Sequence, residues 1–555
     1  MKHRGNEEST RLRSTKSRYV VTSLLVCLFI RILAFSLFSV IQGSNYKYIN
    51  MLINIENMQN EEMKQKDNYI RKGHYTPLEE KSNELEKYFE KNKRNNELRQ
   101  FIFKNDAMHY SFNSDVYNFK YIYDSYILSK MYKDIYSSLT VRINPLFLYI
   151  LHILIFKKIA VKNNKLIENI MNNYEFRYYI IICIVDLLIG FFLFIIIEKL
   201  KKWRKYFNYV NKCKRDKWRL INSILLMNIY LNNPFTILAN VFLSLDNFKL
   251  LLITTSFYLT LLRINNFSNK LWSVLNHFMI MFCNSILLYI SSFHFILSII
   301  GINNLIICID QGVTKYDIKE NIKFFKLFLI ILKNVLLLLI TFTMYTLLIV
   351  TSYYLNSNSL SFLDNTLINE YKVLFLQPNL GNFWYIFSTM FKDYYYSFLF
   401  LFHFHIFLYP LPLFFRLMKT PLIYLKIMIA IALMYHPNIT INDIVYSLLL
   451  LAIDYEKTLY TIPFAKLLII LLGNLNLFFV TMNLWLRKNT GNANYVFFNQ
   501  LVVFNITTFI ITSSIKFYIR VQTPIPQLDE GKCIIVSQKQ EKKCSILNTL
   551  KETFL

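Results

Sequence analysis

The sequence predicts an all-α polytopic membrane protein with about 10–12 transmembrane helices, at roughly 20 residues for each span. Three observations support this fold class. Of the 555 residues, 54% are hydrophobic and 17% are aromatic. Apolar runs of about twenty residues recur along the chain, and each is long enough to cross a hydrocarbon core. Lysine and arginine residues stand mainly between these runs, as they do in the loops of a membrane protein.

The apolar runs give the positions of the predicted spans, and ten to twelve spans all fit the pattern. The runs are residues 19–41, 176–198, 219–245, 249–264, 271–290, 291–309, 323–355, 383–410, 422–436, 441–456, 463–486 and 496–518. We therefore expect a multi-spanning domain over 176–520 that follows a separate first transmembrane helix at 19–41.

The formal net charge of +27 is explained by basic loops that orient the chain in the membrane. A nucleic-acid-binding protein gathers its basic residues on one folded face, whereas here they separate the apolar runs, so we predict no nucleic-acid partner. The densest basic block, 199–218, lies between two predicted spans, where the positive-inside rule places cytosolic loops. A polybasic loop that binds a partner is an alternative for the same residues. Residues 1–18 are also basic and are predicted to be a cytosolic N-terminal segment.

Residues 42–175 are predicted to form a long luminal first loop with surface-lying helices. If the short apolar run 144–156 crossed the membrane, the next span would deliver the basic block to the side opposite the basic N-terminus. We therefore expect 144–156 to lie on the membrane surface. The polar residues 521–555 are predicted to be a cytosolic tail. This order of elements resembles the GT-C architecture of polyprenol-phosphate-dependent glycosyltransferases: one span, a long luminal first loop and then many spans.

Four motifs along the chain point to one family. The stretch PNLGNFWYIFSTMF at 378–391 is accompanied by IRILAF at 30–35, NPFTIL at 233–238 and GNANYVFF at 491–498. These residues resemble the PIG-U family, which carries Pro-Asn-Ile-Gly-Leu-Phe-Trp-Tyr-Phe-Phe at the first of these places. There are two departures, because the polar segment 42–142 is longer than the family's first loop and Val496 replaces a family asparagine.

The resemblance implies a non-catalytic subunit of the GPI transamidase, a multi-pass protein of the endoplasmic reticulum membrane. The implied partners are the other transamidase subunits, including a cysteine-protease-like catalytic subunit, and the GPI lipid that the complex attaches to proteins. The resemblance implies no cofactor. The chain itself contains no HExxH, GxSxG or P-loop motif, so catalysis by this chain has no support from its residues.

A GT-C-type mannosyltransferase of GPI precursor assembly is the alternative function. Such enzymes need an acidic residue in the first loop, often within Asp-x-Asp, as a base or metal ligand. The loop contains Asp106, Asp115, Asp124 and Asp134, but the chain has no Asp-x-Asp. A transporter is a third interpretation, and the repeated halves that usually mark one are not found.

The 378–391 stretch also has a chemistry of its own. Phe383 and Phe387 belong to an aromatic series at helical spacing, which predicts a helix that starts near Pro378 with one aromatic face. An aromatic belt at the membrane interface explains most of these rings and remains open. Asn379 and Gly381 favour contact with a lipid, because an amide and a bare backbone beside rings suit its sugar-phosphate part.

The asparagines of the last motif complete the predicted lipid site. Their amides can donate to and accept from glycan hydroxyls and phosphates, although a plain turn also explains them. An even number of predicted spans separates this turn from the 378–391 stretch, so both should emerge on the same side. Neither is followed by a strongly basic cluster like that at 199–218, which favours the luminal side. The predicted GPI-binding residues are Asn379, Phe383, Trp384, Asn492 and Asn494.

Two further polar sites lie inside predicted spans. Arg31 and Asp186 both lie ~18 Å deep at ~1.5 Å per residue, so we predict an intramembrane ion pair between them. Separate snorkelling or hydrogen bonding of the two is the alternative. His403 and His405 point about 200° apart on a helix and cannot share an ion, so we predict an interhelical hydrogen bond and no metal site.

Overall fold

The computed structural model describes residues 18–36, 119, 136, 141–156, 174–210, 220–262, 270–310, 324–373, 378–417, 420–454, 462–490 and 492–522. Almost all of the predicted cytosolic segment 1–18, of the polar segment 42–142 in the predicted luminal loop 42–175, and of the predicted tail 521–555 lies outside these residues. Within the described residues every regular element is a helix, and no strand occurs. The described part of the chain is therefore all-α.

The helices follow the N-terminal helix Arg18–Ser36. They are α5 (Pro145–Leu151), η2 (His152–Phe156), α7 (Tyr174–Val210), α8 (Ser223–Leu231), α9 (Pro234–Val241), α10 (Asp246–Leu262), α11 (Lys270–Ile290), η4 (Phe293–Phe295), α12 (Ile296–Asp310), α13 (Phe324–Leu355), α14 (Ser361–Leu363), η5 (Asp364–Ile368), α15 (Asn369–Lys372), α16 (Phe383–Thr389), α17 (Tyr395–Phe404), η6 (His405–Leu408), α18 (Pro410–Leu417), α19 (Pro421–Tyr435), α20 (Ile441–Ala452), α22 (Phe464–Met482), η7 (Asn483–Arg487) and α23 (Ala493–Gln522).

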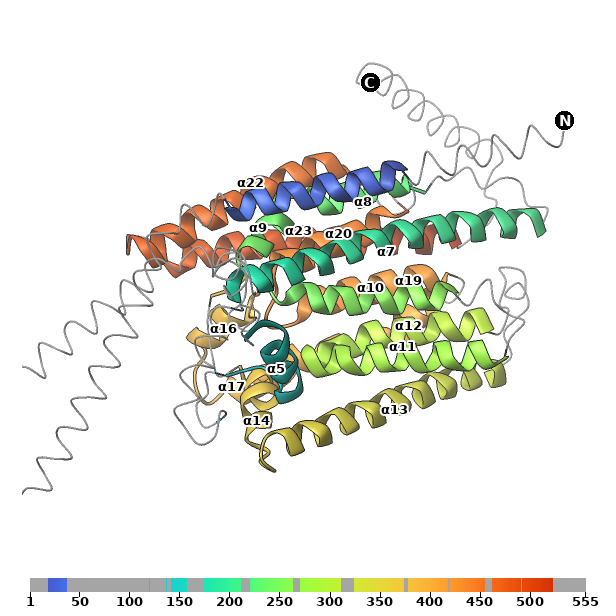
Figure 1. Cartoon of the computed structure of the whole chain (residues 1–555), viewed down its shortest axis with the longest axis horizontal. Coiled ribbons are helices and arrows are strands. Elements are labelled where there is room, and N and C mark those ends of the chain that lie inside the picture. The colour runs from blue at the N-terminus through green and yellow to red at the C-terminus, as the bar shows by residue number, and fades with distance from the viewer. Residues whose placement is uncertain are drawn as a thin grey trace, which may run out of the picture.

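The long helices run side by side in one bundle (Figure 1). The N-terminal helix, α8 and α22 lie along one side of the bundle, and α13 lies along the opposite side. Between them α10 packs against α7 and α11, α12 packs against α19, and α11 packs against α13. The outer helices are little buried within the chain, since only 11% of an apolar 18-residue stretch of Phe328–Leu355 and 17% of one in Arg18–Ser36 are buried. That face suits contact with lipid or with other membrane proteins.

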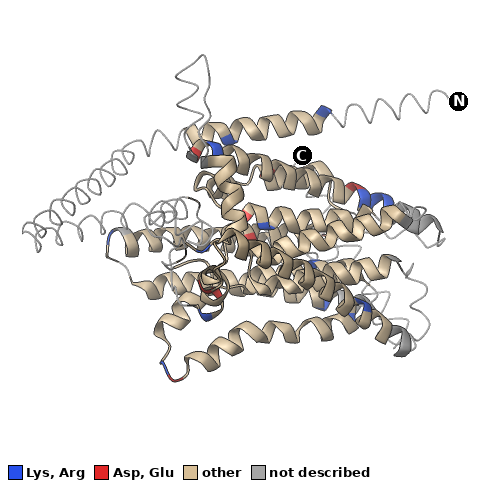
Figure 2. Cartoon of the chain, turned by 60° about the horizontal axis from the view of Figure 1, so that its bottom comes forward, with Lys and Arg blue, Asp and Glu red and all other residues tan. Residues whose placement is uncertain are grey.

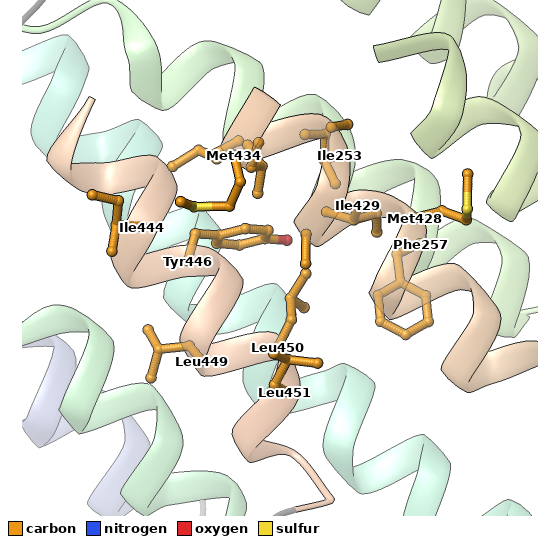
Figure 3. Close-up of a cluster of buried hydrophobic side chains, with 14 of the residues drawn as sticks. Ile253, Phe257, Met428, Ile429, Met434, Ile444, Tyr446, Leu449, Leu450 and Leu451 are labelled. Atoms are coloured by element: carbon orange, nitrogen blue, oxygen red, sulfur yellow. The ribbon is translucent and has the colours of Figure 1, made fainter. Parts of the chain in front are cut away.

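The middle of the bundle is a continuous hydrophobic core. Figure 3 shows Ile253 and Phe257 of α10, Met428 of α19 and Tyr446 of α20 converging there. A close approach of α12 and α19 depends on Gly301, because a Cβ at this position would lie 3.0 Å from Leu425 Cδ1 and 3.2 Å from Leu425 Cα. Close packing of small residues compensates for the weak hydrophobic drive between helices in lipid.

Seven helices are each long and apolar enough to cross a membrane, counted over the described residues. They are Arg18–Ser36, Glu175–Lys202, Leu271–Ile290, Phe328–Leu355, Tyr395–Leu417, Ala465–Leu486 and Ala493–Phe517. This confirms an all-α polytopic membrane protein. The shorter α10, α12, α19 and α20 cover four more of the predicted spans and run along the same bundle (Figure 1). The total of 10–12 spans and the likeness to the GT-C architecture remain predictions.

Two predicted spans are interrupted in the structure. The run 219–245 divides into α8 and α9, which meet at an angle of 43°. The NPFTIL motif makes this bend, because Asn233 caps α9 by accepting from Phe235 N at 3.0 Å and Pro234 starts the new helix. The predicted span 219–245 is therefore a bent pair of helices, which together are long and apolar enough for one broken span.

The predicted span 383–410 begins too early, because the long apolar helix of the structure is Tyr395–Leu417. The short α16 ends at Thr389, Met390 takes an extended conformation with ψ 137°, and a new helix starts at Tyr395. Lys392 and Asp393 are exposed in the turn between the two helices. Charged side chains of this kind are costly within a bilayer, so the spanning helix begins after them. Pro378 does not begin α16 either, since the residue before the first helical turn is Asn382.

The run 144–156 forms α5 and the π-helix η2, which together are shorter than a membrane span. Leu148, Leu151 and Ile155 are buried, whereas Tyr149 and Ile153 are exposed. In Figure 1 α5 lies at one end of the bundle, near α14. This arrangement fits a helix on the membrane surface, and the side of the membrane remains a prediction.

Candidate functional site

The 378–391 motif is folded around one buried amide. Asn379 donates from Nδ2 to the Pro437 carbonyl at 3.2 Å and accepts at Oδ1 from Gly381 N at 2.6 Å. A Cβ at position 381 would lie 2.9 Å from Asn379 Oδ1 and 3.0 Å from the Pro437 oxygen. Glycine is therefore needed at 381 for the motif to approach the Pro437 loop this closely.

The 378–391 motif and the start of α23 are in direct contact. Trp384 Nε1 donates to the Asn379 carbonyl and to Gln500 Oε1, both at 3.1 Å. The Tyr385 hydroxyl donates to the Asn494 side chain. Tyr385 also stacks on Phe497 with ring centroids 4.1 Å apart. The structure thus brings the two motifs of the predicted lipid site together at one end of the bundle.

The predicted site residues differ in how exposed they are. Asn379, Phe383 and Trp384 are buried, with exposed fractions of 6%, 5% and 5%. Asn492 and Asn494 are exposed, and Gly491 lies outside the described residues. The first three hold the motif together from inside. Of the five predicted residues, Asn492 and Asn494 are therefore the two whose side chains are exposed to a ligand.

A loop that the sequence analysis did not single out connects the 378–391 motif with Glu370 and α20. We call residues 436–440, with the sequence HPNIT, the 436–440 loop. Its Pro437 carbonyl accepts from Asn379, and its Asn438 side chain donates to Glu370 Oε1 at 3.4 Å. Thr440 begins α20 with a reciprocal capping box to Asp443.

Behind this loop lies a fully buried ionic cluster. Lys249 Nζ lies 2.5 Å from Asp246 Oδ1 and 2.7 Å from Asp443 Oδ1. His436 Nε2 is 2.9 Å from Asp443 Oδ2, and the Thr440 hydroxyl donates to Asp246 at 2.5 Å. Figure 2 shows helices that are tan over most of their length, with few charged positions inside the bundle. Buried charges persist only where they are paired in this way, so the cluster locks α10 to α20.

The predicted partners Arg31 and Asp186 form a second buried ion pair. Arg31 Nε donates to Asp186 Oδ2 at 3.1 Å, and both side chains are essentially inaccessible to solvent. Tyr230 donates to Asp186 Oδ1 at 2.6 Å, and Asn240 donates to Oδ2 at 2.9 Å. The bend at NPFTIL places these two donors, because Tyr230 lies in α8 and Asn240 in α9.

A row of amides joins the two buried ionic groups. Asn247 donates to Asn240 at 2.6 Å, and Asn442 donates to Asn247 at 2.9 Å. Asn240 contacts Asp186 of the first pair, and Asn442 precedes Asp443 of the cluster. The polar interior therefore runs without interruption from the N-terminal helix to α20.

The two histidines of the aromatic helix behave differently. His403 Nδ1 lies 3.2 Å from Nε2 of the buried His294, which belongs to η4. This confirms the expected interhelical hydrogen bond for His403. His405 instead bonds to carbonyl oxygens of its own helix, at 3.1 Å to Leu401 and 2.9 Å to Phe402.

A cavity of about 210 Å³ lies next to the 436–440 loop. Its walls come from α5, α11, α13 and the η5–α15 segment, and Pro437 and Asn438 line it as well. Glu370 of α15 contributes an acidic group to this wall. Burial raises the pKa of Glu370 to about 7, against the opposing effect of the Asn438 hydrogen bond. Its charged and neutral forms therefore both occur near neutral pH.

The sequence offered only weak signals for the loop and the cavity. Thr440 followed by Asp443 is a capping-box pattern that marks the start of a helix. Nothing in the spacing of Glu370 relates it to α11 or α13, because the cavity forms only when distant segments pack. Sequence analysis therefore named Trp384 and Asn494 of the motif contact, left out their partners Gln500 and Tyr385, and missed the cavity.

Fold and site together define a polytopic all-α membrane protein with a polar, partly exposed site at one end of its bundle. The family model described as GPI transamidase subunit PIG-U matches residues 92–504. The chain therefore belongs to the PIG-U family.

Individual relatives match over a shorter stretch. The chain is 27% identical over 141 residues to the GPI-anchor transamidase component PIGU of Homo sapiens, covering 25% of this chain and 32% of the relative. It is 28% identical to the protein of the same name from Mus musculus, with the same coverage. The aligned stretch thus spans about a third of the length of these relatives.

Proposed function

We propose that this chain is a non-catalytic subunit of the GPI transamidase and helps to bind the GPI lipid and present it for attachment to proteins. One observation carries the proposal beyond family membership. The 378–391 motif and the 491–498 motif, which are far apart in the chain, meet through Tyr385 and Asn494 at one end of the bundle. Family membership also favours this function over the mannosyltransferase alternative.

The residues of the site divide into two roles under this proposal. Asn379 and Trp384 fix the shape of the motif, because their polar atoms are bonded within the chain. Asn492 and Asn494 are exposed and can exchange hydrogen bonds with glycan hydroxyls or phosphates. The rings of Tyr385 and Phe497 stack beside Asn494 and supply an apolar border.

The proposed setting is the endoplasmic reticulum membrane, in a complex with the other transamidase subunits. The cysteine-protease-like subunit would perform the chemistry, and this chain would supply the lipid. The exposed apolar faces of α13 and of the N-terminal helix are available for contact with partner helices or bulk lipid.

Substitution of Asn494 tests the proposal. In cells whose only copy carries Asn494→Ala, we expect less GPI-anchored protein at the surface while the subunit still co-precipitates with its complex. The change removes an exposed amide and the hydrogen bond that it accepts from Tyr385, and it leaves the buried core intact. A hydrogen bond of this kind is worth about 0.5–1.5 kcal/mol. Flow cytometry of GPI-anchored proteins measures the first effect, and immunoprecipitation from mild detergent measures the second.

Thr490→Ala is the matched control, because Thr490 is also exposed and precedes the same turn. Asn379→Ala should instead lower the amount of folded subunit, since it removes a buried support. Normal surface levels in cells carrying Asn492→Ala/Asn494→Ala protein would reject the proposed lipid contact. Absence of the other subunits from the immunoprecipitate of the unaltered chain would reject the proposed complex.

A further inference from the structure

The cavity beside the 436–440 loop has one acidic group in a largely apolar wall. Glu370 lies on the short helix α15 and is only partly exposed. The Asn438 amide donates to Glu370 Oε1 at 3.4 Å, which is a long contact for a carboxylate. A carboxyl group in this position can accept a stronger, charge-assisted hydrogen bond from a cationic ligand.

Aromatic rings surround the same space. Phe293, Phe342 and Tyr345 all line the cavity together with Glu370. The faces of aromatic rings attract cations, and a carboxylate among several rings is an arrangement that recognises ammonium groups.

The cavity is accessible from the outer surface of the bundle. Two lining residues, Phe342 of α13 and Leu367 of η5, remain 38% and 46% exposed. The Phe328–Leu355 span that carries Phe342 is the least buried of the seven long helices. A lipid that lies against α13 could therefore place its headgroup in the cavity without crossing the bundle.

We propose that this cavity binds the primary ammonium group of an amphipathic ligand, with Glu370 as its counter-ion and Phe293, Phe342 and Tyr345 as its aromatic wall. Arg142 lines the same cavity, so a phosphate next to the ammonium group would meet a positive charge. The ligand class is accordingly a lipid with an aminoalkyl phosphate headgroup.

Two lipids share this chemistry: the GPI lipid and an aminophospholipid of the bilayer. The assignment to the GPI lipid rests on the function proposed above. A transamidase joins a carbonyl group to an amine, so the GPI lipid must offer an amine to the complex. An aminophospholipid of the surrounding bilayer carries the same group. The arms of the experiment separate these two sources.

The direct test uses the full-length chain purified in mild detergent, together with any subunits that remain bound. Native mass spectrometry compares short-chain phosphatidylethanolamine with its N-acetylated derivative, which keeps the phosphate and loses the positive charge. We expect phosphatidylethanolamine to bind roughly tenfold more tightly, because its ammonium group can pair with Glu370. The isosteric Glu370→Gln change should remove this preference.

Asp364→Asn is the matched control, since Asp364 is an exposed acid six residues before Glu370 and does not line the cavity. This variant should keep the tenfold preference. Equal binding of the two lipids by the unaltered protein would overturn the proposal, and this comparison needs no folded variant. A preference that survives Glu370→Gln would overturn it as well.

Cells carrying only Glu370→Gln protein identify the source of the amine. Loss of surface GPI-anchored proteins with an intact subunit complex assigns the cavity to the GPI lipid. Normal surface levels, with the lipid preference lost in vitro, assign it to an aminophospholipid. A failure of the unaltered chain to co-precipitate transamidase subunits would reject the proposed function and leave the ammonium test unaffected.

Discussion

Single buried polar residues fix the geometry of the site at the residue scale. Asn379 connects its own motif to the Pro437 carbonyl, and Thr440 connects α20 to Asp246. Each of these groups is fully or almost fully inaccessible to solvent, so its hydrogen bonds are not replaced by water when they break. The exposed Asn492 and Asn494 can be changed at lower cost, which separates supporting residues from ligand-facing ones.

The ion pair between Arg31 and Asp186 gives a prediction at the same scale. Asp186→Asn should destabilise the protein by about 3–5 kcal/mol, because Arg31 would remain buried without a counter-ion. Replacing both partners with apolar residues, as in Arg31→Met/Asp186→Leu, should recover much of this loss, since no uncompensated charge then remains. Thermal unfolding of the detergent-purified protein measures the difference.

Asp364→Asn again serves as the control, because it neutralises an exposed carboxylate and should leave the unfolding temperature nearly unchanged. An Asp186→Asn protein as stable as the unaltered one would show that the pair contributes nothing to stability. A double variant no better than Asp186→Asn would show that the loss arises from packing and not from charge.

Individual helices show why some elements follow from the sequence and others do not. Long apolar runs such as 323–355 predict their helices well, because one run becomes one uninterrupted span. The start of the predicted span 383–410 was wrong because the aromatic spacing continues through the turn at Met390. Lys392 and Asp393, which are exposed in this turn, were the signal that the span begins after them. The bend at NPFTIL was visible as an Asn-Pro pair, which typically starts a new helix.

The contact between α12 and α19 gives a prediction at the scale of the element. Gly301→Ala should destabilise the protein by roughly 1–3 kcal/mol, because the new Cβ would press on the Leu425 backbone and force the two helices apart. Gly473→Ala is the matched control in α22, where a Cβ would meet no atom within 4 Å. It should be neutral or stabilise by roughly 0.5–1 kcal/mol, since alanine is the better helix former.

Unfolding temperatures of the two variants, measured side by side in the same detergent, test this contrast. Equal effects of Gly301→Ala and Gly473→Ala would indicate that α12 and α19 adjust freely to an extra methyl group.

At the scale of the whole molecule, hydropathy and motif positions predict the class of protein and the meeting of two motifs. They do not predict the 436–440 loop or the cavity. The contacts that define these features join residues far apart in the chain, such as Thr440 with Asp246 across 194 positions and Asn438 with Glu370 across 68. Hydrophobic periodicity reports which side of one helix is apolar and carries no information about which distant polar groups meet.

The overall arrangement of charge leads to a final prediction about orientation. The N-terminal helix begins at the end of the bundle that is away from α5 and α16 (Figure 1). The basic C-terminal end of α7 lies at that same end. Lys201 and Lys202 belong to that basic end of α7, and positive charge of this kind is retained on the cytosolic side. The motif contact and the cavity should therefore face the lumen.

Single cysteines at two exposed positions test this orientation in sealed microsomes. With the seven native cysteines replaced, Lys202→Cys should react with a membrane-impermeant thiol reagent from outside, because that side corresponds to the cytosol. Asn492→Cys should react only after detergent opens the vesicles, because the membrane separates it from the reagent. Immediate labelling of Asn492→Cys in intact vesicles would place the motif contact on the cytosolic side, where a luminal lipid substrate could not reach it.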